Sequence, residues 1–365
     1  MSAQSPMPRS SWLFPILAIA FVAVTAAAGL AFTRSAGGLV FAAVLLVILF
    51  GTVFAAVHHA EVIAQRIGEP YGTLLLTLAV TIIEVALIAT IMLGEKAAPA
   101  LARDTVFAVL MIVCNALVGV CIIAGCFRHR ELDFQVSGVN IYLGVLIVLA
   151  TITLILPNYT LAAPGPYFSA TQLAFVSIVT LILYGLFLYT QTVRHRDYFI
   201  AGEQGDPDQH PPVSNAMLGI SFALLLVSLL AVVLLAKTFS QVVDAVTLAI
   251  GAPPSFAAIV VALLVLLPES VAAIAAAKRN DLQKGINLAL GSSLATIGLT
   301  IPAVAVVTTV LNKELVLGLG ARETVLLIMT MLVSMLTFGT GRTNIMFGVV
   351  HVVLFAVFVF LVFAP

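Results

Sequence analysis

The sequence is poor in charge and in cysteine. Only 9% of its 365 residues are Asp, Glu, Lys or Arg, whereas soluble domains average about a quarter. Hydrophobic residues make up 62%, which excludes a soluble protein. The 16 basic and 16 acidic residues balance, so no basic surface for nucleic acid is expected. The 3 cysteines lie in or beside one apolar run, and their odd number argues against a disulfide framework or a zinc site.

The motifs of common enzyme classes are also missing. The chain contains no His-Glu-x-x-His zinc motif, no phosphate-binding loop ending in Gly-Lys-Ser/Thr and no Gly-x-Ser-x-Gly nucleophile elbow. No lysine lies in the middle of an apolar run, where a retinal Schiff base would need one. We therefore expect a protein that is not an enzyme and that carries no resident cofactor.

Long apolar runs make up most of the chain. A bilayer core of about 30 Å takes about 20 helical residues, and eleven runs reach that length. They cover roughly residues 12–33, 37–57, 71–94, 104–127, 138–157, 169–193, 216–236, 255–277, 284–309, 322–340 and 344–364. The amphipathic stretch 238–254 ends in Gly-Ala-Pro-Pro and is interpreted as a broken entry to the eighth span. The sequence predicts an all-α polytopic membrane protein with about 11 transmembrane helices.

The Lys and Arg residues between the spans indicate an orientation. Ten of them lie on the side of the N-terminus and six on the other side. The positive-inside rule then places the N-terminus in the cytoplasm and, because eleven is odd, the C-terminus outside. The first run is too long for a typical signal peptide, so we expect it to be retained, with cleavage as the alternative. We expect an integral protein of a bacterial inner membrane, and the sequence predicts no oligomeric state.

A polar segment at residues 194–215 divides the apolar runs into two sets. It contains His, Asp and Glu residues and is either a plain cytoplasmic linker or a regulatory segment that senses cations or pH. Residues 1–36 form an extra N-terminal helix, five spans follow in residues 37–193, and five more lie in residues 216–365. Because five is odd, the second set enters the membrane with the opposite polarity, as in an inverted repeat.

Two glutamates lie deep inside apolar runs. Glu84 is about fourteen residues into the third span and Glu269 about fifteen into the eighth, so each is about 20 Å along its helix. A carboxylate at that depth costs about 2.5–3.5 kcal/mol on insertion scales, and such residues usually mark an ion path. Each glutamate lies in the second span of its five-span set. An inverted repeat would bring them together at the membrane midplane.

A pair of facing carboxylates provides a physical basis for exchange. One divalent cation or two protons neutralise the pair, whereas a charged and empty pair is unfavourable in a dry interior. Burial and like-charge repulsion favour protonation, so protons compete with the cation. If alternation between the two membrane faces requires neutral carboxylates, cation movement becomes coupled to proton movement in the opposite direction.

Polar residues near the two glutamates are candidate secondary ligands, because hard cations prefer oxygen. Thr77 and Thr81 lie on the same helical face as Glu84, either as ligands or bonded back to the helix. Pro268 leaves a backbone carbonyl without its helical partner beside Glu269. The next span of each set adds polar groups that serve either helix packing or the site: Asn115, Asn287, Ser292, Ser293 and Thr296.

Titratable residues also gather after the second span. His58, His59 and Glu61 follow it, and Glu69 precedes the third span. The simple interpretation is a hydrated turn at the membrane edge. The alternative is a cytoplasmic gate or a proton antenna.

Taken together, these residues resemble the calcium/cation exchanger superfamily, and in particular its bacterial ChaA-type calcium/proton and sodium-potassium/proton antiporters. The resemblance runs from about residue 58 to the C-terminus. It is carried by the stretches Gly68-Glu69-Pro70-Tyr71-Gly72, Thr81-Ile82-Ile83-Glu84, Leu267-Pro268-Glu269, 287–302 and Phe338-Gly339-Thr340-Gly341-Arg342-Thr343-Asn344.

The resemblance implies eleven helices, inverted repeats, and Glu84 and Glu269 as the carboxylates that bind cation and proton. Val80-Thr81 and Val265-Leu266 stand where the superfamily has Gly-Asn, so an amide ligand is missing from each half and the cargo is Ca2+, or Na+ and K+. We expect a secondary antiporter whose partners are inorganic cations, protons and the lipid bilayer. A sodium/calcium exchanger with the same site, a membrane enzyme and a membrane sensor are the alternatives.

Overall fold

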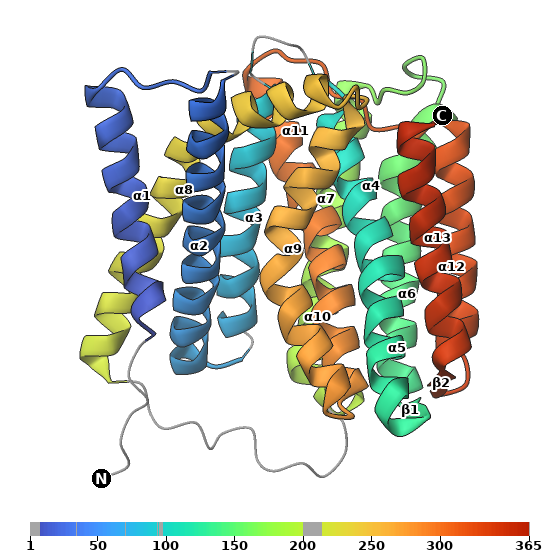
Figure 1. Cartoon of the computed structure of the whole chain (residues 1–365). Coiled ribbons are helices and arrows are strands. Elements are labelled where there is room, and N and C mark those ends of the chain that lie inside the picture. The colour runs from blue at the N-terminus through green and yellow to red at the C-terminus, as the bar shows by residue number, and fades with distance from the viewer. Residues whose placement is uncertain are drawn as a thin grey trace. The chain divides into compact units, whose positions relative to one another are not determined.

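The computed structural model describes residues 8–33, 35–69, 71–92, 94, 98–199 and 214–364. Eleven helices in this part of the chain are long and apolar enough to cross a membrane (Figure 1). The predicted all-α class and the predicted number of spans are therefore confirmed. By packing, the chain forms two compact units, residues 1–97 with 204–251 (unit 1) and residues 98–203 with 252–365 (unit 2).

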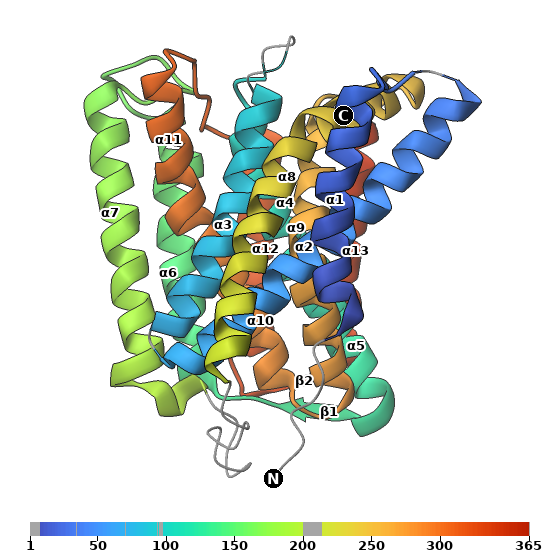
Figure 2. The same ribbon diagram turned by 90° about the vertical axis from the view of Figure 1, so that its left-hand side faces the viewer.

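The described residues of unit 1 form four helices. These are α1 (Arg9–Ala27), α2 (Ala36–Ile67), α3 (Tyr71–Met92) and α8 (Asn215–Ala249). Helix α2 packs against the other three, and α8 also contacts α1 and α3 (Figures 1 and 2). Ser35 and Ser214 cap the starts of α2 and α8 by accepting hydrogen bonds from backbone N–H groups of the first turn.

Two helices of unit 1 are longer than the apolar runs that predict them. Helix α2 has 32 residues and continues to Ile67, and α8 has 35 residues and continues to Ala249. The interpretation of 238–254 as a broken entry to the eighth span is therefore wrong, because residues 238–249 continue the seventh span. Backbone hydrogen bonds are local, so a helix continues past the end of its apolar run until the chain must turn. Gly68 and Gly251 then follow with φ of 76° and 64°.

Unit 2 contains the remaining elements. Its helical spans are α4 (Leu101–Met111), η1 (Ile112–Leu117) and α5 (Val118–His129); α6 (Val136–Ala150), η2 (Thr151–Ile155) and η3 (Leu156–Asn158); α7 (Ala170–Tyr189), η4 (Thr190–Arg194) and η5 (Arg196–Phe199); α9 (Ser255–Lys278); α10 (Leu282–Ala295), η6 (Thr296–Thr300) and α11 (Ile301–Val310); α12 (Ala321–Phe338); and α13 (Ile345–Phe363). The strands β1 (Glu131–Asp133) and β2 (Arg342–Asn344) pair antiparallel, with Leu132 opposite Thr343.

Within unit 2, helices from the two predicted halves of the chain pack against one another. Helix α5 and segment η1 pack against α13, whereas α11 and η6 pack against α7 (Figure 2). The third span of each half thus contacts the last span of the other half. Gly119 and Gly348 allow the close contact between α5 and α13, because a Cβ added at Gly119 would lie 2.8 Å from the Gly348 carbonyl oxygen.

Four segments of unit 2 have π-helical hydrogen bonding: η1, η2, η4 and η6. Segments η1 and η6 lie inside the third span of each predicted half. A π-helical segment widens one helical turn and often occurs at functional sites. These two segments therefore change which side chains face which neighbour at the depth of the predicted site.

Candidate functional site

Glu84 lies on α3 in unit 1 with a side chain that is only 1% exposed. Thr77 and Thr81 share its helix face, as the spacing predicts. Each threonine hydroxyl donates to the carbonyl oxygen four residues earlier, over 2.7 Å at Thr77 and 2.9 Å at Thr81. A hydroxyl oxygen keeps lone pairs when its hydrogen is donated. The buried face of α3 therefore presents a carboxylate and, at Thr81, a buried hydroxyl oxygen.

Glu269 lies on α9 in unit 2, where it is partly buried. Pro268 is buried inside the continuous helix α9 and supplies no N–H to the carbonyl of Leu264. That carbonyl lies one turn before Glu269 on the same helix. Glu84 and Glu269 belong to different units, so their meeting at the midplane stays a prediction.

Helix α10 brings further hydroxyl groups to the level of Glu269. A Cβ added at Gly285 would lie 3.1 Å from the carbonyl oxygen of Ala273, so α10 approaches the backbone of α9 closely at this point (Figure 1). The two helices form an antiparallel hairpin. Glu269 lies one turn before Ala273, and Ala289 lies one turn after Gly285, so Glu269 and Ala289 are at the same level. Ser292, Ser293 and Thr296 follow within about two turns.

The three hydroxyl residues differ in their surroundings. Ser293 is 0% exposed, and its hydroxyl has no hydrogen-bond partner among the described residues. Thr296 is buried at the start of η6, and Ser292 is partly buried. A buried hydroxyl without a partner is unfavourable by about 1–3 kcal/mol. Ser293 is thus the described hydroxyl at this level that most needs a ligand.

The amide of Asn115 is occupied by a buried network in unit 2. Its Nδ2 donates to Thr330 Oγ1 over 2.9 Å, and its Oδ1 lies 3.3 Å from Nδ1 of His351. His351 Nε2 lies 2.9 Å from Thr337 Oγ1, and all four side chains are 0% exposed. Because an amide oxygen only accepts, Nδ1 of His351 is the donor in this contact. The network connects η1 to α12 and α13.

Asn115 nevertheless lies at the depth of the predicted site. Helices α4 and α9 begin at the same end of unit 2, where Arg103 and Ser255 line one cavity. Asn115 is twelve residues beyond Arg103 and Leu267 is twelve beyond Ser255, so both are about 18 Å deeper. Asn115 is therefore close to the level of Glu269, and its hydrogen-bond partners are not apparent from the sequence.

Asn287 is also occupied by partners in unit 2. Its Nδ2 donates to the carbonyl oxygen of Phe199 over 2.5 Å, and its Oδ1 accepts from Nε2 of Gln283 over 2.9 Å. Its carbonyl oxygen accepts a hydrogen bond from Tyr142 Oη, and Gln191 donates to the same Oη over 2.7 Å. This network joins α10 to α6, to η4 and to η5.

The candidate gate residues lie in one long helix and the turn after it. His58 and His59 are within α2, with ring centroids 5.5 Å apart, and His59 Nε2 lies 2.9 Å from the Ser11 carbonyl oxygen of α1. Glu61 is exposed on α2. Glu69 is exposed beyond the end of α2 and accepts from Thr73 Oγ1 over 2.7 Å. The expected turn therefore begins only after Ile67, and His58, His59 and Glu61 lie in α2 before it.

Only the two ends of the predicted linker are described, residues 194–199 and residues 214 and 215 at the start of α8. Arg194 ends η4, His195 follows it, and residues 196–199 form η5, in which Phe199 is buried. Residues 200–213 lie outside the described part. The regulatory alternative rests on the acidic and histidine residues of the predicted linker, of which His195 and Asp197 are described and those between 203 and 210 are not.

Sequence reasoning missed the residues that hold the two asparagines in place. Thr330 and Thr337 are threonines inside an apolar span, and Tyr142 and Gln191 lie in spans of their own. Their partners are 14 to 215 residues away along the chain. His351, a lone histidine in the last span, belongs to the same network as Asn115.

Comparison with known proteins identifies relatives over nearly the whole chain. The chain is 44% identical over 362 residues to y4hA of Sinorhizobium fredii, which is named for ionic transport, covering 98% of this chain and 97% of the relative. It is 36% identical over 323 residues to the sodium-potassium/proton antiporter ChaA of Escherichia coli, covering 87% of each.

Solved structures have a similar fold. Native YfkE matches with a TM-score of 0.70 at 16% identity and covers 97% of this chain and 100% of that chain. The H+/Ca2+ exchanger CAX matches with a TM-score of 0.69 at 13% identity and covers 96% and 89%. The model of the sodium/calcium exchanger protein family matches residues 37–193 and 220–364. The chain therefore belongs to the sodium/calcium exchanger protein family.

Proposed function

We propose that this protein is a secondary active antiporter that exports Ca2+, or Na+ and K+, in exchange for protons. The transported ions bind at Glu84 and Glu269 and reach the two membrane faces alternately. The observation that carries the proposal is the pair of carboxylates at mid-span depth in two membrane helices, one of them only 1% exposed. Carboxylates in such positions require neutralisation by a cation or a proton.

The arrangement of the chain supports a paired site. The family model matches two separate stretches, residues 37–193 and 220–364, and each glutamate lies in the second span of its stretch. We infer that the two stretches are inverted repeats that bring Glu84 and Glu269 together near the midplane. The N-terminus would be cytoplasmic, as the distribution of Lys and Arg predicts.

Oxygen ligands around each glutamate support a cation as the cargo. On α3, Thr81 keeps a buried hydroxyl oxygen one turn from Glu84. On α9 and α10, the Leu264 carbonyl and the Ser293 hydroxyl lie near the level of Glu269. Carboxylate, hydroxyl and carbonyl oxygens are the ligands of Ca2+ and of other hard cations. The amides of Asn115 and Asn287 already have partners, so we assign them to holding the helices rather than to binding the ion.

The names of the relatives support both classes of cargo. ChaA is named for sodium-potassium/proton exchange, and YfkE for Ca2+/H+ antiport. Thr81 and Leu266, three residues before the two glutamates, occupy the positions where the superfamily has an amide. Loss of amide ligands weakens the argument for Ca2+ alone and favours a site that also accepts monovalent ions.

The test is cation-induced proton movement in proteoliposomes. Wild type, Glu84→Gln and Glu269→Gln are compared with Ca2+, Na+ and K+ over a range of pH. Glu131→Gln, an exposed glutamate on β1, is the matched control. We expect at least one cation to dissipate an imposed proton gradient with wild type and the control, and neither midplane variant to do so. Normal activity of either midplane variant would refute the paired site.

A sodium/calcium exchanger is the second candidate, because the exchanger NCX_Mj shares the fold with a TM-score of 0.54. The two candidates differ in the driving gradient. If Ca2+ uptake into the vesicles follows an outward sodium gradient and ignores the pH gradient, exchange with sodium replaces exchange with protons. The membrane enzyme and the sensor have no further support in the described residues.

A further inference from the structure

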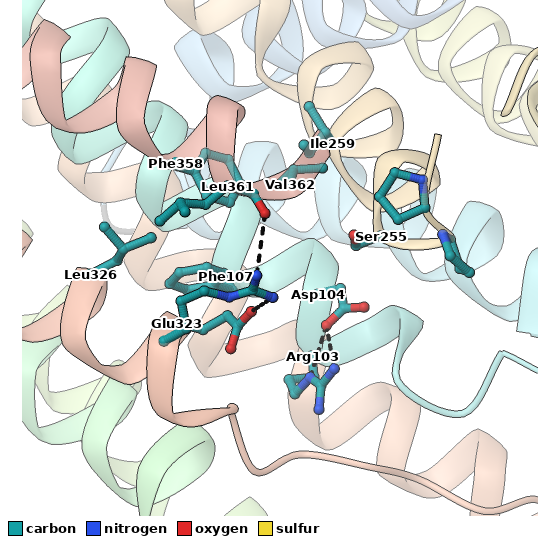
Figure 3. Close-up of a pocket in the computed structure, with 13 residues that line it drawn as sticks. Arg103, Asp104, Phe107, Ser255, Ile259, Glu323, Leu326, Phe358, Leu361 and Val362 are labelled. Carbon is teal, nitrogen blue, oxygen red and sulfur yellow. Dashed lines mark hydrogen bonds and ion pairs between the residues drawn. The ribbon is translucent and has the colours of Figure 1, made fainter. Parts of the chain in front are cut away.

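A cavity of about 350 Å3 lies within unit 2, at the end where α4, α9 and α12 begin and α13 ends (Figure 3). Its volume is at the lower end of the range of about 300–1,000 Å3 that is typical of small-molecule sites. The cavity is about 18 Å from the depth of Glu269 along α9 and shares no residue with the proposed transport site.

The lining of the cavity changes from polar to apolar with depth. On α4, α9 and α12 the lining residues Arg103, Ser255 and Arg322 lie in the first turn of the helix. Four residues later, about 6 Å deeper, the same three helices contribute apolar residues. These are Phe107, Ile259 and Leu326.

The same depth profile matches a membrane boundary. The three helices begin three of the eleven spans, so their first turns lie where the hydrocarbon core gives way to headgroups. Phe358 of α13 adds to the apolar part, whereas Leu361 and Val362 lie in the last turn of α13 beside the polar end. A ligand that fits this profile has a polar end at headgroup level and an apolar end toward the core.

Two arginine–carboxylate pairs provide the charge of the polar end. Arg103 contacts Asp104 over 2.7 Å and also donates to the carbonyl oxygen of Gly318 over 2.9 Å. Arg322 contacts Glu323 over 3.0 Å and reaches the Leu361 carbonyl oxygen at 3.5 Å (Figure 3). The carboxylates are thus already neutralised by arginine, which makes a cation a poor ligand for this cavity.

Arg322 keeps the capacity to bind an anion. A guanidinium carries five N–H donors, and within the described residues Arg322 uses two of them, one in the long contact with Leu361. Its side chain is 42% exposed. The N-termini of α4, α9 and α12 lie at this end together with the C-terminus of α13. The helix dipoles therefore add net partial positive charge, whereas the two ion pairs are balanced. Arginine with spare donors is well suited to phosphate oxygens.

We propose that this cavity binds a membrane phospholipid. The phosphodiester group contacts Arg322 at the polar end, and the start of an acyl chain lies against Phe107, Ile259 and Leu326. A bound lipid would stabilise the ends of α4, α9, α12 and α13 relative to one another, whichever ion the protein transports.

The test measures thermal unfolding of purified protein in a neutral detergent during titration with short-chain phosphatidylglycerol. Arg322→Gln is the test variant, and Arg322→Lys retains the charge but not the forked geometry. The matched control is Arg342→Gln, because Arg342 also pairs with a carboxylate, Asp133, at 3.0 Å but lies on β2 outside the cavity. Parallel titrations use glycerol phosphate, which lacks the chains, and a monoacylglycerol, which lacks the phosphate.

We expect the lipid to raise the unfolding temperature of wild type and of Arg342→Gln. In Arg322→Gln the apparent affinity should fall about tenfold, as expected for the loss of a charge-assisted hydrogen bond, with Arg322→Lys between the two. Three results would overturn the proposal. They are an unchanged lipid response in Arg322→Gln, an equal response of wild type to glycerol phosphate or to the monoacylglycerol, and no response of wild type to the lipid.

Discussion

Replacement of Asn115 by alanine distinguishes two possible roles of this residue, which are to hold neighbouring helices together and to bind the transported ion. Asn115 lies at the depth of Glu269, yet its amide is bonded to Thr330 and His351. If Asn115 holds η1 against α12 and α13, its loss lowers stability and leaves the cation preference unchanged. If it binds the ion directly, its loss weakens cation affinity. Thr330→Val removes one of the same hydrogen bonds without removing the amide.

The structure gives the expected magnitudes. A hydrogen bond between buried side chains contributes about 1 kcal/mol, and double-mutant cycles in membrane helices average about 0.6 kcal/mol with a maximum near 1.7. Thr330→Val loses its bond with Asn115 and a long contact with the sulfur of Met111, and should cost about 1 kcal/mol. Asn115→Ala loses its bonds with Thr330 and His351 and a long contact with the same sulfur, and should cost about 2 kcal/mol. At about 2–4 °C per kcal/mol, the unfolding temperature falls by about 2–4 °C and about 4–8 °C.

The assay combines thermal unfolding in detergent with the cation concentration that half-saturates proton release in proteoliposomes. Thr324→Val is the matched control, because Thr324 is a partly exposed threonine in the first turn of the same helix, α12, and its hydroxyl bonds, among the described residues, only to the Gly320 carbonyl oxygen next to this turn. We expect both network variants to lose stability in the stated order and to keep the half-saturating concentrations of wild type. Asn115→Ala with normal stability and a cation affinity weakened tenfold would refute the structural role.

Three further predictions concern single side chains. Ser293→Ala should raise the unfolding temperature of cation-free protein, because it removes a buried hydroxyl without a described partner. The same variant should weaken cation affinity severalfold, and no change in affinity would contradict a role for Ser293 in the site. Gly285→Val should destabilise the protein by about 1–3 kcal/mol and reduce transport, because the valine side chain would meet the backbone of α9. Gly144→Val is the control, because a side chain at Gly144 meets open space, and it should change neither stability nor transport. Arg342→Gln should change stability by no more than about 0.5 kcal/mol in chemical unfolding, because its ion pair with Asp133 is exposed, and a loss above 1 kcal/mol would contradict this.

The sequence predicts the number of membrane spans and the position of each glutamate along its helix well, for a physical reason. Hydropathy and helical rise depend only on the residues of one segment and on the bilayer, and an ionisable residue stands out in an apolar run. The back-bonding of Thr77 and Thr81 is also local, because the acceptors lie four residues away on the same helix.

Features that depend on distant partners escape the same reasoning. The amides of Asn115 and Asn287 find partners on other helices, and nothing in the residues next to them indicates this. The π-helical segments η1 and η6 have no signature in the apolar periodicity. The apolar run predicts a helix that is shorter than α8, which continues through polar residues to Ala249. The length of an apolar run reflects the thickness of the membrane and not the full length of the helix.

Proton release on cation binding tests the central claim most directly, because the claim is that cation and proton compete for the same two carboxylates. Purified protein in weakly buffered detergent solution is mixed with Ca2+, Na+ or K+, and the change in pH is recorded for wild type, Glu84→Gln, Glu269→Gln and the control Glu131→Gln. The account predicts that the transported cation releases protons from wild type and the control, and that each midplane variant releases fewer or none. Cation binding without proton release in wild type, or unchanged release in both midplane variants, would contradict it.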